Sequence, residues 1–349
     1  MNSLRPSPTM VCVALLILGS HLASAQRFVH APIYNSGVNA LAAVSSDFNG
    51  DGNVDLAFLG GGNSAMVTIR LGAGDGKFTA GQALTLSVGG DDIITGDWNR
   101  DGVLDLAVAF CSSKEISILL GNGDGTFTMG GAFDSGVCAS ALATGDLNGD
   151  GIPDIAGNQS VVLGNGDGTF AAPIRNNSNG DAPTLADVNS DGKLDLVGTG
   201  SDTFFNGNME VLLGNGDGTF QSRVLYDAST GAGGRPVVAD FNHDGVLDVA
   251  VGGTQVSVYI GNGDGSFQPQ ITYTSTPFGS YSGVVGADLN KDGNLDLLTV
   301  QGDGNLGGTM LGNADGSFKT ASLFGTGPFP IFLYGGRFQQ RRQARRCRT

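Results

Sequence analysis

Short apolar runs, separated by polar turns rich in Gly, Asn and Asp, follow one another along most of this chain. Residues 104–110 form one such run, and residues 116–120 form the next, with apolar and polar positions arranged as in a strand. No segment keeps a 3.6-residue periodicity, and glycine, at 59 of 349 residues, recurs throughout. The pattern predicts an all-β protein built from short antiparallel strands.

The run pattern repeats at intervals of 50, 49, 41, 53 and 48 residues, marked each time by the nonapeptide D-x-N-x-D-G-x-x-D. The six copies begin at Asp47, Asp97, Asp146, Asp187, Asp240 and Asp288. A second turn of the type G-N-G-D-G-T-F follows each copy, at 72–78, 121–127, 164–170, 214–220, 261–267 and 312–318. Four strands joined by such turns are typical of one antiparallel propeller blade, and a repeat of this length matches one blade. The Phe that ends each second turn is expected to anchor the core between blades.

The amino-terminal segment 27–34 resembles the fourth strand of a repeat that lacks its first three strands. A propeller often closes its ring when one terminus donates a strand to the blade at the other end. The sixth repeat already has a fourth strand, which starts at Phe318, so the extra strand predicts a seventh blade. We therefore expect a seven-bladed β-propeller of four-stranded antiparallel blades, with six complete repeats and an aberrant seventh.

The basic tail at 337–349, with six Arg in thirteen residues, stands where a seventh loop is expected. One set of codons for this tail, read one base later, encodes D-F-N-S-D-G-K-P-D-V-V, which matches the nonapeptide and the strand after it. A frameshift of the seventh repeat is therefore our hypothesis, and a disordered basic tail is the alternative.

The amino terminus at 1–25 has the features of a secretory signal. A basic residue, Arg5, precedes the apolar run at 10–19, and Ala23-Ser24-Ala25 forms a small-residue cleavage site. We expect three segments: a signal peptide at 1–25, the propeller at 26–336 and the basic tail at 337–349. The protein is expected to be secreted, to the extracellular space or the periplasm, and nothing after the signal is long enough to span a bilayer.

The nonapeptide places oxygen side chains at positions 1, 3, 5 and 9, and its Gly at position 6 permits a tight left-handed turn. Oxygen-only ligands in a flexible loop suit Ca²⁺, with a main-chain carbonyl at position 7. An EF-hand is excluded, because position 12 is never the required Glu. We predict about six structural Ca²⁺ ions, held at Asp47, Asn49, Asp51, Asn53, Asp55, Asp97, Asn99, Asp101, Val103, Asp105, Asp146, Asn148, Asp150, Ile152, Asp154, Asp187, Asn189, Asp191, Lys193, Asp195, Asp240, Asn242, Asp244, Val246, Asp248, Asp288, Asn290, Asp292, Asn294 and Asp296.

The charge of the chain supports this interpretation. The net charge of the chain is −15. Of its 33 acidic residues, 31 are Asp, and most of these belong to the repeated turns. So acidic a chain is not expected to bind nucleic acid or anionic lipid. The remaining acids, including Asp91 and Asp92, are expected on the solvated surface.

Catalytic groupings are not recognisable. Only His30 and His243 remain after removal of the signal, and His243 occupies the variable position 4 of a loop. Cys111 and Cys138 either form a disulfide, as export allows, or remain as buried thiols. The second turn is expected to be a hairpin turn rather than a metal or phosphate site.

With these motifs the chain resembles the FG-GAP/VCBS repeat family, which is related to the N-terminal propeller of integrin α subunits. The resemblance covers about residues 27–336 and implies a β-propeller with Ca²⁺ between the first and second strands of its blades. We expect a monomeric binding or adhesion module for a protein or glycan, and not an enzyme, because no catalytic grouping is found. A lectin with sugar sites between blades, or a polysaccharide lyase-like enzyme, is the alternative.

Overall fold

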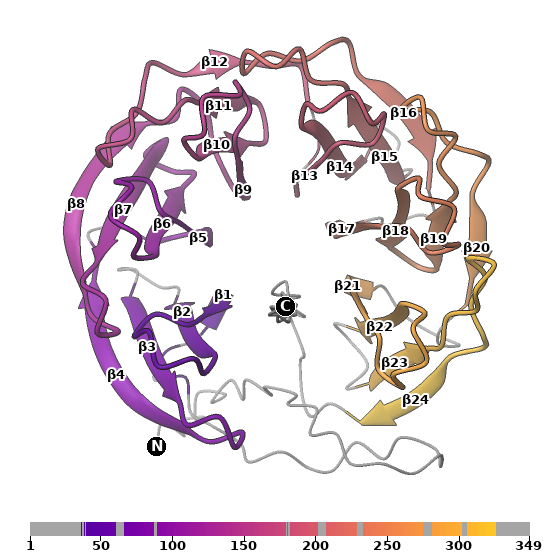
Figure 1. Ribbon diagram of the computed structural model, residues 1–349, viewed down its shortest axis with the longest axis horizontal. Helices are drawn as coiled ribbons and strands as arrows, with labels where there is room; N and C mark the ends of the chain where they lie inside the picture. Colours follow the sequence, from indigo (N-terminus) through magenta and orange to yellow (C-terminus); the bar gives the residue numbers. More distant parts are fainter. Residues whose placement is uncertain are drawn as a thin grey trace, which may run out of the picture.

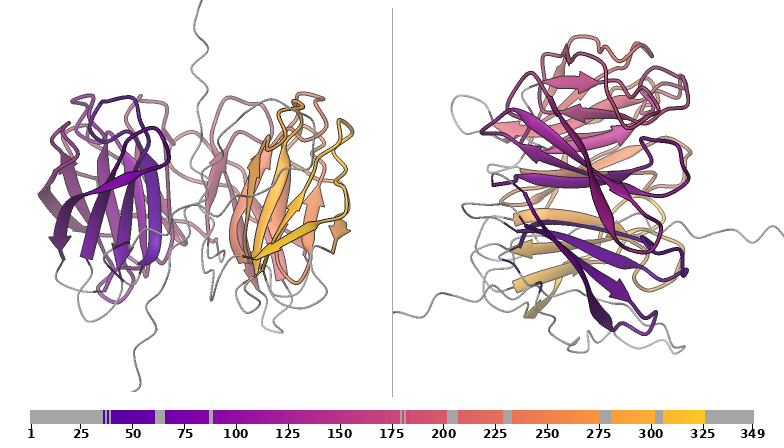
Figure 2. Two further views of the ribbon diagram at one scale, coloured as in Figure 1. Left: turned by 90° about the horizontal axis from the view of Figure 1, so that it is seen from below. Right: turned by 90° about the vertical axis from the view of Figure 1, so that its left-hand side faces the viewer.

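The protein forms a ring of β-sheets. Its computed structural model describes residues 36, 38, 40–60, 66–86, 89–178, 180, 182–201, 207–228, 233–274, 281–301 and 306–325. Within these residues, 24 strands form six separate four-stranded sheets. Neighbouring strands are antiparallel, and in every sheet they follow the order of the sequence. The sheets stand as blades around a central axis, as Figure 1 shows along that axis and Figure 2 shows from two sides.

The strands of each blade come from one repeat. Blade 1 contains β1 (Ala40–Ser46), β2 (Asp55–Gly60), β3 (Met66–Gly72) and β4 (Phe78–Thr85). Blade 2 contains β5 (Asp92–Gly96), β6 (Asp105–Phe110), β7 (Glu115–Gly121) and β8 (Phe127–Asp134). Blade 3 contains β9 (Leu142–Gly145), β10 (Asp154–Gly157), β11 (Ser160–Val162) and β12 (Ile174–Arg175). Blade 4 contains β13 (Thr184–Ala186), β14 (Asp195–Ser201), β15 (Gly207–Leu212) and β16 (Val224–Asp227). Blade 5 contains β17 (Gly233–Ala239), β18 (Asp248–Gly252), β19 (Val256–Tyr259) and β20 (Ile271–Tyr273). Blade 6 contains β21 (Tyr281–Ala287), β22 (Asp296–Gln301), β23 (Leu306–Met310) and β24 (Ser322–Gly325).

The expectation of seven blades is wrong: the described residues form six blades of four strands each. The prediction of an all-β propeller of four-stranded blades is confirmed. Each repeat completes its own sheet, because the second turn folds the fourth strand back onto the third strand of the same repeat. The seventh blade was inferred from segments 27–34 and 337–349, and both lie outside the described residues, as does the signal sequence at 1–25.

Burial changes from the centre of each blade to its outer edge. The first strands line the axis and the fourth strands form the rim (Figure 1). Every residue of β6 is buried, whereas most of β8 is exposed. The second strand of a blade lies between the first and third strands, and its two faces pack against the neighbouring blades. Its sequence is therefore a continuous apolar run. The hydrophobic core therefore lies between blades, where Leu59 and Ile69 of blade 1 cluster with Ile93 and Leu106 of blade 2.

The Phe that ends the second turn packs at the contact with the preceding blade in blades 2 to 6, as predicted. Phe127 of blade 2 packs edge-on against Phe48, at position 2 of the blade 1 loop, with 5.5 Å between ring centroids. Phe318 of blade 6 and Phe241 of blade 5 repeat this arrangement at 5.4 Å. Aromatic pairs of this geometry contribute about 0.5–1.5 kcal/mol beyond the area that they bury.

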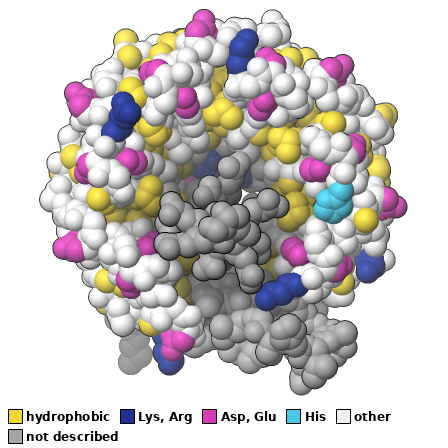
Figure 3. Space-filling model, in the orientation of Figure 1, with side chains coloured by type: hydrophobic (Ala, Val, Ile, Leu, Met, Phe, Trp, Pro, Cys, Tyr) yellow, Lys and Arg dark blue, Asp and Glu magenta, His cyan; other side chains and the backbone are white. Residues whose placement is uncertain are grey.

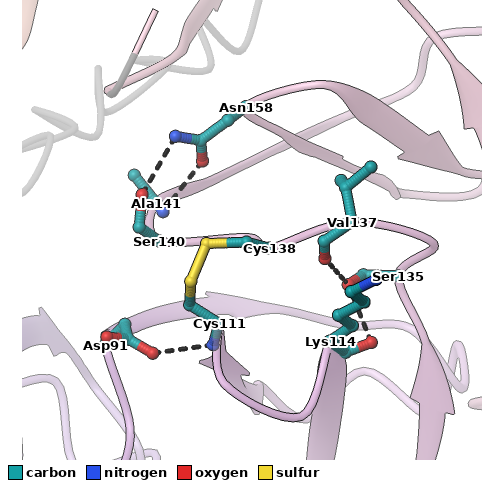
Figure 4. The surroundings of a disulfide bond; sticks show 9 residues. All are labelled: Asp91, Cys111, Lys114, Ser135, Val137, Cys138, Ser140, Ala141 and Asn158. Carbon is teal, nitrogen blue, oxygen red and sulfur yellow. Dashed lines mark hydrogen bonds between the residues drawn. A yellow bond between two sulfur atoms is a disulfide. The ribbon is translucent and has the colours of Figure 1, made fainter.

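A disulfide joins Cys111 to Cys138 (Figure 4), so the disulfide is the correct one of the two alternatives that the sequence left open. Cys111 follows β6, and Cys138 lies in the segment that leads from blade 2 to blade 3. The Asp91 carboxylate accepts a hydrogen bond from the Cys111 amide at 2.7 Å. The bond therefore fastens the crossover between blades 2 and 3 to a turn of blade 2.

Candidate metal-binding loops

Both repeated motifs lie at the same end of every blade. The nonapeptide connects the first strand to the second, and the G-N-G-D-G-T-F turn connects the third strand to the fourth. Because the strands are antiparallel and in sequential order, these two connections share one end of the sheet. Acidic side chains are spaced around the ring on the face shown in Figure 3.

The side-chain oxygens of each loop hold the loop's own backbone, as the third copy shows. One carboxylate oxygen of Asp146 accepts a hydrogen bond from the amide of Gly151 at 2.8 Å. Asn148 Oδ1 accepts the amide of Asp150 at 3.0 Å, and Asp150 Oδ1 accepts the amide of Ile152 at 2.8 Å. The chain therefore curls around the oxygens of positions 1, 3 and 5, which come together at the surface.

Two positions of every loop have a left-handed backbone. Position 6 is always Gly, with φ between 79° and 93°. Position 4 is also left-handed in all six loops, although it is Gly in only two of them; its residues are Gly50, Arg100, Gly149, Ser190, His243 and Lys291. Position 4 is variable in sequence, because four different side chains occur there besides Gly, and its shared backbone conformation is not evident from the residue types. These four residues adopt a conformation that costs a non-glycine residue about 1–2 kcal/mol.

The Asp at position 9 is fully buried in all six loops and joins the two motifs. In blade 3, Asp154 accepts the amide of Leu147, at loop position 2, and the amide of Gly164, the first residue of the second turn, both at 2.8 Å. A Cβ on Gly164 would lie 2.5 Å from the carbonyl oxygen of Pro153, so only glycine fits. The corresponding distances in the other five blades are 2.1–2.3 Å.

From the sequence we predicted two separate motifs and did not predict this link. The glycine that opens the second turn in all six copies was the available signal, because a turn alone does not require glycine at that position. The nonapeptide and the second turn therefore form one structural unit with the buried carboxylate at its centre.

Burial raises the pKa of all six position-9 carboxyl groups above the ordinary value for Asp. For Asp105, the amides of Gly121 and Trp98 oppose this effect, and the carboxylates of Asp101 and Asp97 add to it. The negative charge of each buried position-9 carboxylate is thus unfavourable in the protein alone. A cation placed among these oxygens would remove that penalty.

The donor set suits a hard cation. Three carboxylates and one amide supply only oxygen, and a carboxylate oxygen that accepts one N–H keeps a second lone pair. In the described part of the chain, no group of three or more His, Cys, Asp or Glu side chains forms a metal cluster by itself. The carboxylates are turned instead toward backbone amides, and Ca²⁺ at these residues stays a prediction.

Asp92, expected on the surface, is buried and forms an ion pair with Arg235. These residues lie on β5 and β17, in blades that face each other across the ring (Figure 1). Asp92 also accepts the amide of Leu142 at 2.8 Å, and Arg235 donates to the carbonyl of Pro183 at 3.0 Å. Burial raises the pKa of Asp92, and the nearby Arg235 opposes this effect. The pair therefore connects blades 2, 3, 4 and 5 near the axis.

His243 is the one histidine within the described ranges, and its Nε2 lies 3.2 Å from the side-chain oxygen of Asn294. Asn294 occupies position 7 of the neighbouring blade's loop. This contact joins two adjacent loops and contains no nucleophile.

The sequence profile described as FG-GAP-like repeat matches residues 47–108, 97–157, 187–251 and 249–299. No curated protein sequence matches the chain. The search for a bilayer-spanning apolar helix, made over the described part of the chain, found none.

Solved structures with the same fold share little sequence with the chain. A lectin from Agrocybe aegerita that recognises non-reducing terminal N-acetylglucosamine is 21% identical, with a TM-score of 0.60 over 84% of this chain and 82% of the lectin. A protein from Lactobacillus plantarum is 12% identical, with a TM-score of 0.59 over 83% of this chain and 86% of that protein. BBS1N, solved in complex with ARL6DN, is 13% identical, with a TM-score of 0.55 over 82% and 83% of the two chains. At such identities the likeness establishes the fold alone.

Proposed function

We propose, since this chain belongs to the FG-GAP-like repeat family, that it is a calcium-stabilised propeller that acts as an extracellular binding module. The observation that carries the proposal is the construction of the six loops. Each contains three Asp and one Asn within nine residues, and each connects through one buried carboxylate to the second turn of its blade. A cation in such a loop would fasten the first, second and third strands of the blade together.

The residues that would hold the ion are the same in every blade. In blade 2 they are Asp97, Asn99, Asp101 and Asp105, with the carbonyl of Val103. Bound Ca²⁺ would offset the negative charge of the buried carboxylate. The role is structural, because the loop ties strands of one blade and has no helices to move, unlike the loop of an EF-hand.

Carbohydrate is the ligand class that we propose first. The fold likeness to the Agrocybe aegerita lectin supports it, at the level of fold only. The strongly acidic composition argues against polyanionic ligands. A protein ligand is the second outcome that the binding experiment distinguishes. Export through the signal sequence at 1–25 would bring the loops to a compartment rich in Ca²⁺.

Calorimetry tests whether the loops bind Ca²⁺, and thermal melts test whether the bound ions stabilise the fold. Purified protein stripped with chelator is titrated with Ca²⁺, and about six ions per chain should bind, with a higher melting temperature as the result. The control is Asp124→Asn, in the second turn, because the Asp124 carboxylate accepts its own turn's Thr126 amide and hydroxyl at 2.9 and 2.6 Å. This variant should keep all ions, and an unchanged melting temperature of the native protein in chelator would sink the metal proposal.

A glycan array, probed with the Ca²⁺-loaded protein and again in chelator, tests the ligand. Binding to particular terminal sugars that is lost in chelator supports a lectin-like module. Depolymerisation of a polysaccharide would show an enzyme and overturn the binding-module proposal. Binding to no glycan would leave a protein as the ligand class.

A further inference from the structure

Main-chain hydrogen bonds connect the metal-loop residues of one blade to the second turn of the next. The amide of Gly125, in blade 2, donates to the carbonyl of Phe48, in the loop of blade 1, at 3.1 Å. The amide of Gly168, in blade 3, donates in the same way to Trp98 of blade 2 at 3.1 Å. The amide of Gly218, in blade 4, donates to Leu147 of blade 3, also at 3.1 Å. Three successive junctions thus carry the same bond.

The peptide that accepts this bond is itself held by the buried carboxylate of its own loop. The amide of Trp98 donates to Asp105 at 3.1 Å, while the carbonyl of Trp98 accepts from blade 3. The second turn of blade 3, which contains Gly168, is also bonded to its own blade, because the amide of its first residue, Gly164, donates to Asp154 at 2.8 Å. From Asp105 to Asp154, the connection runs through three hydrogen bonds, a single loop residue and one turn.

Side-chain packing reinforces this connection at each junction. The Trp98 side chain is fully buried and packs against Phe170, which ends the blade 3 turn, with ring centroids 6.4 Å apart. Gly168 lies against Asn99, because a Cβ on that glycine would stand 3.7 Å from the Asn99 Cβ. Movement of position 2 or position 3 of a loop therefore moves the turn of the following blade.

We propose that this chain of hydrogen bonds, which we call the relay, couples neighbouring metal loops in blades 1 to 4, so that Ca²⁺ in one loop orders the second turn of the next blade. The inference rests on the proposed calcium function. Ca²⁺ on the buried carboxylate fixes the position-2 peptide, and that peptide restrains the amide of the next turn. The ordered turn then presents its own first glycine to the next carboxylate, so the next ion binds a loop that is already partly ordered.

The junction between blades 5 and 6 provides an internal control. There the glycine equivalent to Gly168 is Gly316, and its amide donates to Asn313 of its own turn at 3.1 Å. The packing of Phe318 on Phe241 is nevertheless present. This junction therefore has the aromatic contact between blades, but the Gly316 amide donates its hydrogen bond within its own turn.

The test uses two matched double variants of the full protein: Asp97→Asn with Asp101→Asn in blade 2, and Asp240→Asn with Asp244→Asn in blade 5. Each removes charge from positions 1 and 5 and leaves the buried carboxylate in place. Amide hydrogen exchange is measured in saturating Ca²⁺. The blade 2 variant should exchange the Gly168 amide about fivefold or more faster than the native protein. The blade 5 variant should leave the Gly316 amide within about twofold of its native rate.

A native rate at Gly168 in the blade 2 variant would overturn the relay, as would equal acceleration of Gly316 in the blade 5 variant. The corresponding blade 3 variant, Asp146→Asn with Asp150→Asn, read at Gly218, repeats the test if the blade 2 variant does not fold. Metal content separates the two proposals. A native protein that binds no Ca²⁺ contradicts the proposed function, whereas loss of one ion with unchanged exchange at the next turn contradicts only the relay.

Discussion

Gly121, the first residue of the blade 2 second turn, offers the sharpest test of the link between the two motifs. A Cβ on this residue would lie 2.3 Å from the carbonyl oxygen of Leu104, about 1 Å closer than carbon and oxygen ordinarily approach. The Gly121→Ala variant must therefore move the turn away from the loop. The movement strains the packing by about 1–3 kcal/mol. It also breaks the 2.9 Å hydrogen bond from the Gly121 amide to Asp105, which contributes about 1.5–3 kcal/mol.

The expected loss in the free energy of unfolding is thus about 2.5–6 kcal/mol. Gly102→Ala is the matched control in the same blade: Gly102 has φ +84°, and a Cβ there meets nothing within 4 Å. Its cost is the backbone term alone, about 1–2 kcal/mol. Urea unfolding in Ca²⁺ buffer measures both, followed by the fluorescence of Trp98, the only tryptophan of the chain. Equal losses for the two variants would refute the close approach of turn and loop.

Three further predictions concern other parts of the ring. Arg100→Gly should raise the free energy of unfolding by about 0.5 kcal/mol, because left-handed strain is relieved at φ 59°; a lower free energy in urea unfolding would show that the arginine side chain stabilises the loop. Replacing Cys111 and Cys138 together by Ser should lower the free energy of unfolding by about 3–4 kcal/mol for a sequence separation of 27, and alkylation of the unreduced native protein should find neither thiol. Asp92→Asn and Arg235→Gln should each cost about 3 kcal/mol and their combination little more than either, whereas additive losses in a double-mutant cycle would contradict the ion pair.

The sequence predicted the blade and its turns because both are local. The nonapeptide at Asp146 and the apolar run after it are set by turn chemistry and by burial, which neighbouring residues determine. The number of blades could not be obtained in this way. It depended on a terminal segment and on the tail, and neither contains a pattern that fixes its partner.

Long-range contacts account for the remaining differences. Asp92 and Arg235 are 143 residues apart, and nothing near either residue distinguishes them from solvated charges. The left-handed backbone at Arg100 follows from the curl of the loop around its oxygens, which side-chain identity does not reveal. The bond from Gly164 to Asp154 crosses two strands and became visible only when the blade was assembled.

The bonds that join one blade to the next at Gly125, Gly168 and Gly218 are made by main-chain atoms. These hydrogen bonds, unlike the aromatic packing beside them, do not depend on which particular side chains the neighbouring repeats carry. A duplicated repeat could be inserted into the ring, or one removed, and the new neighbours would meet with the same carbonyl and amide. The Asp92–Arg235 pair is different in kind, since it requires two particular blades to stand opposite each other. The main-chain bonds on the loop face are therefore compatible with the gain or loss of a repeat. The ion pair near the axis is compatible only with the present order of the blades.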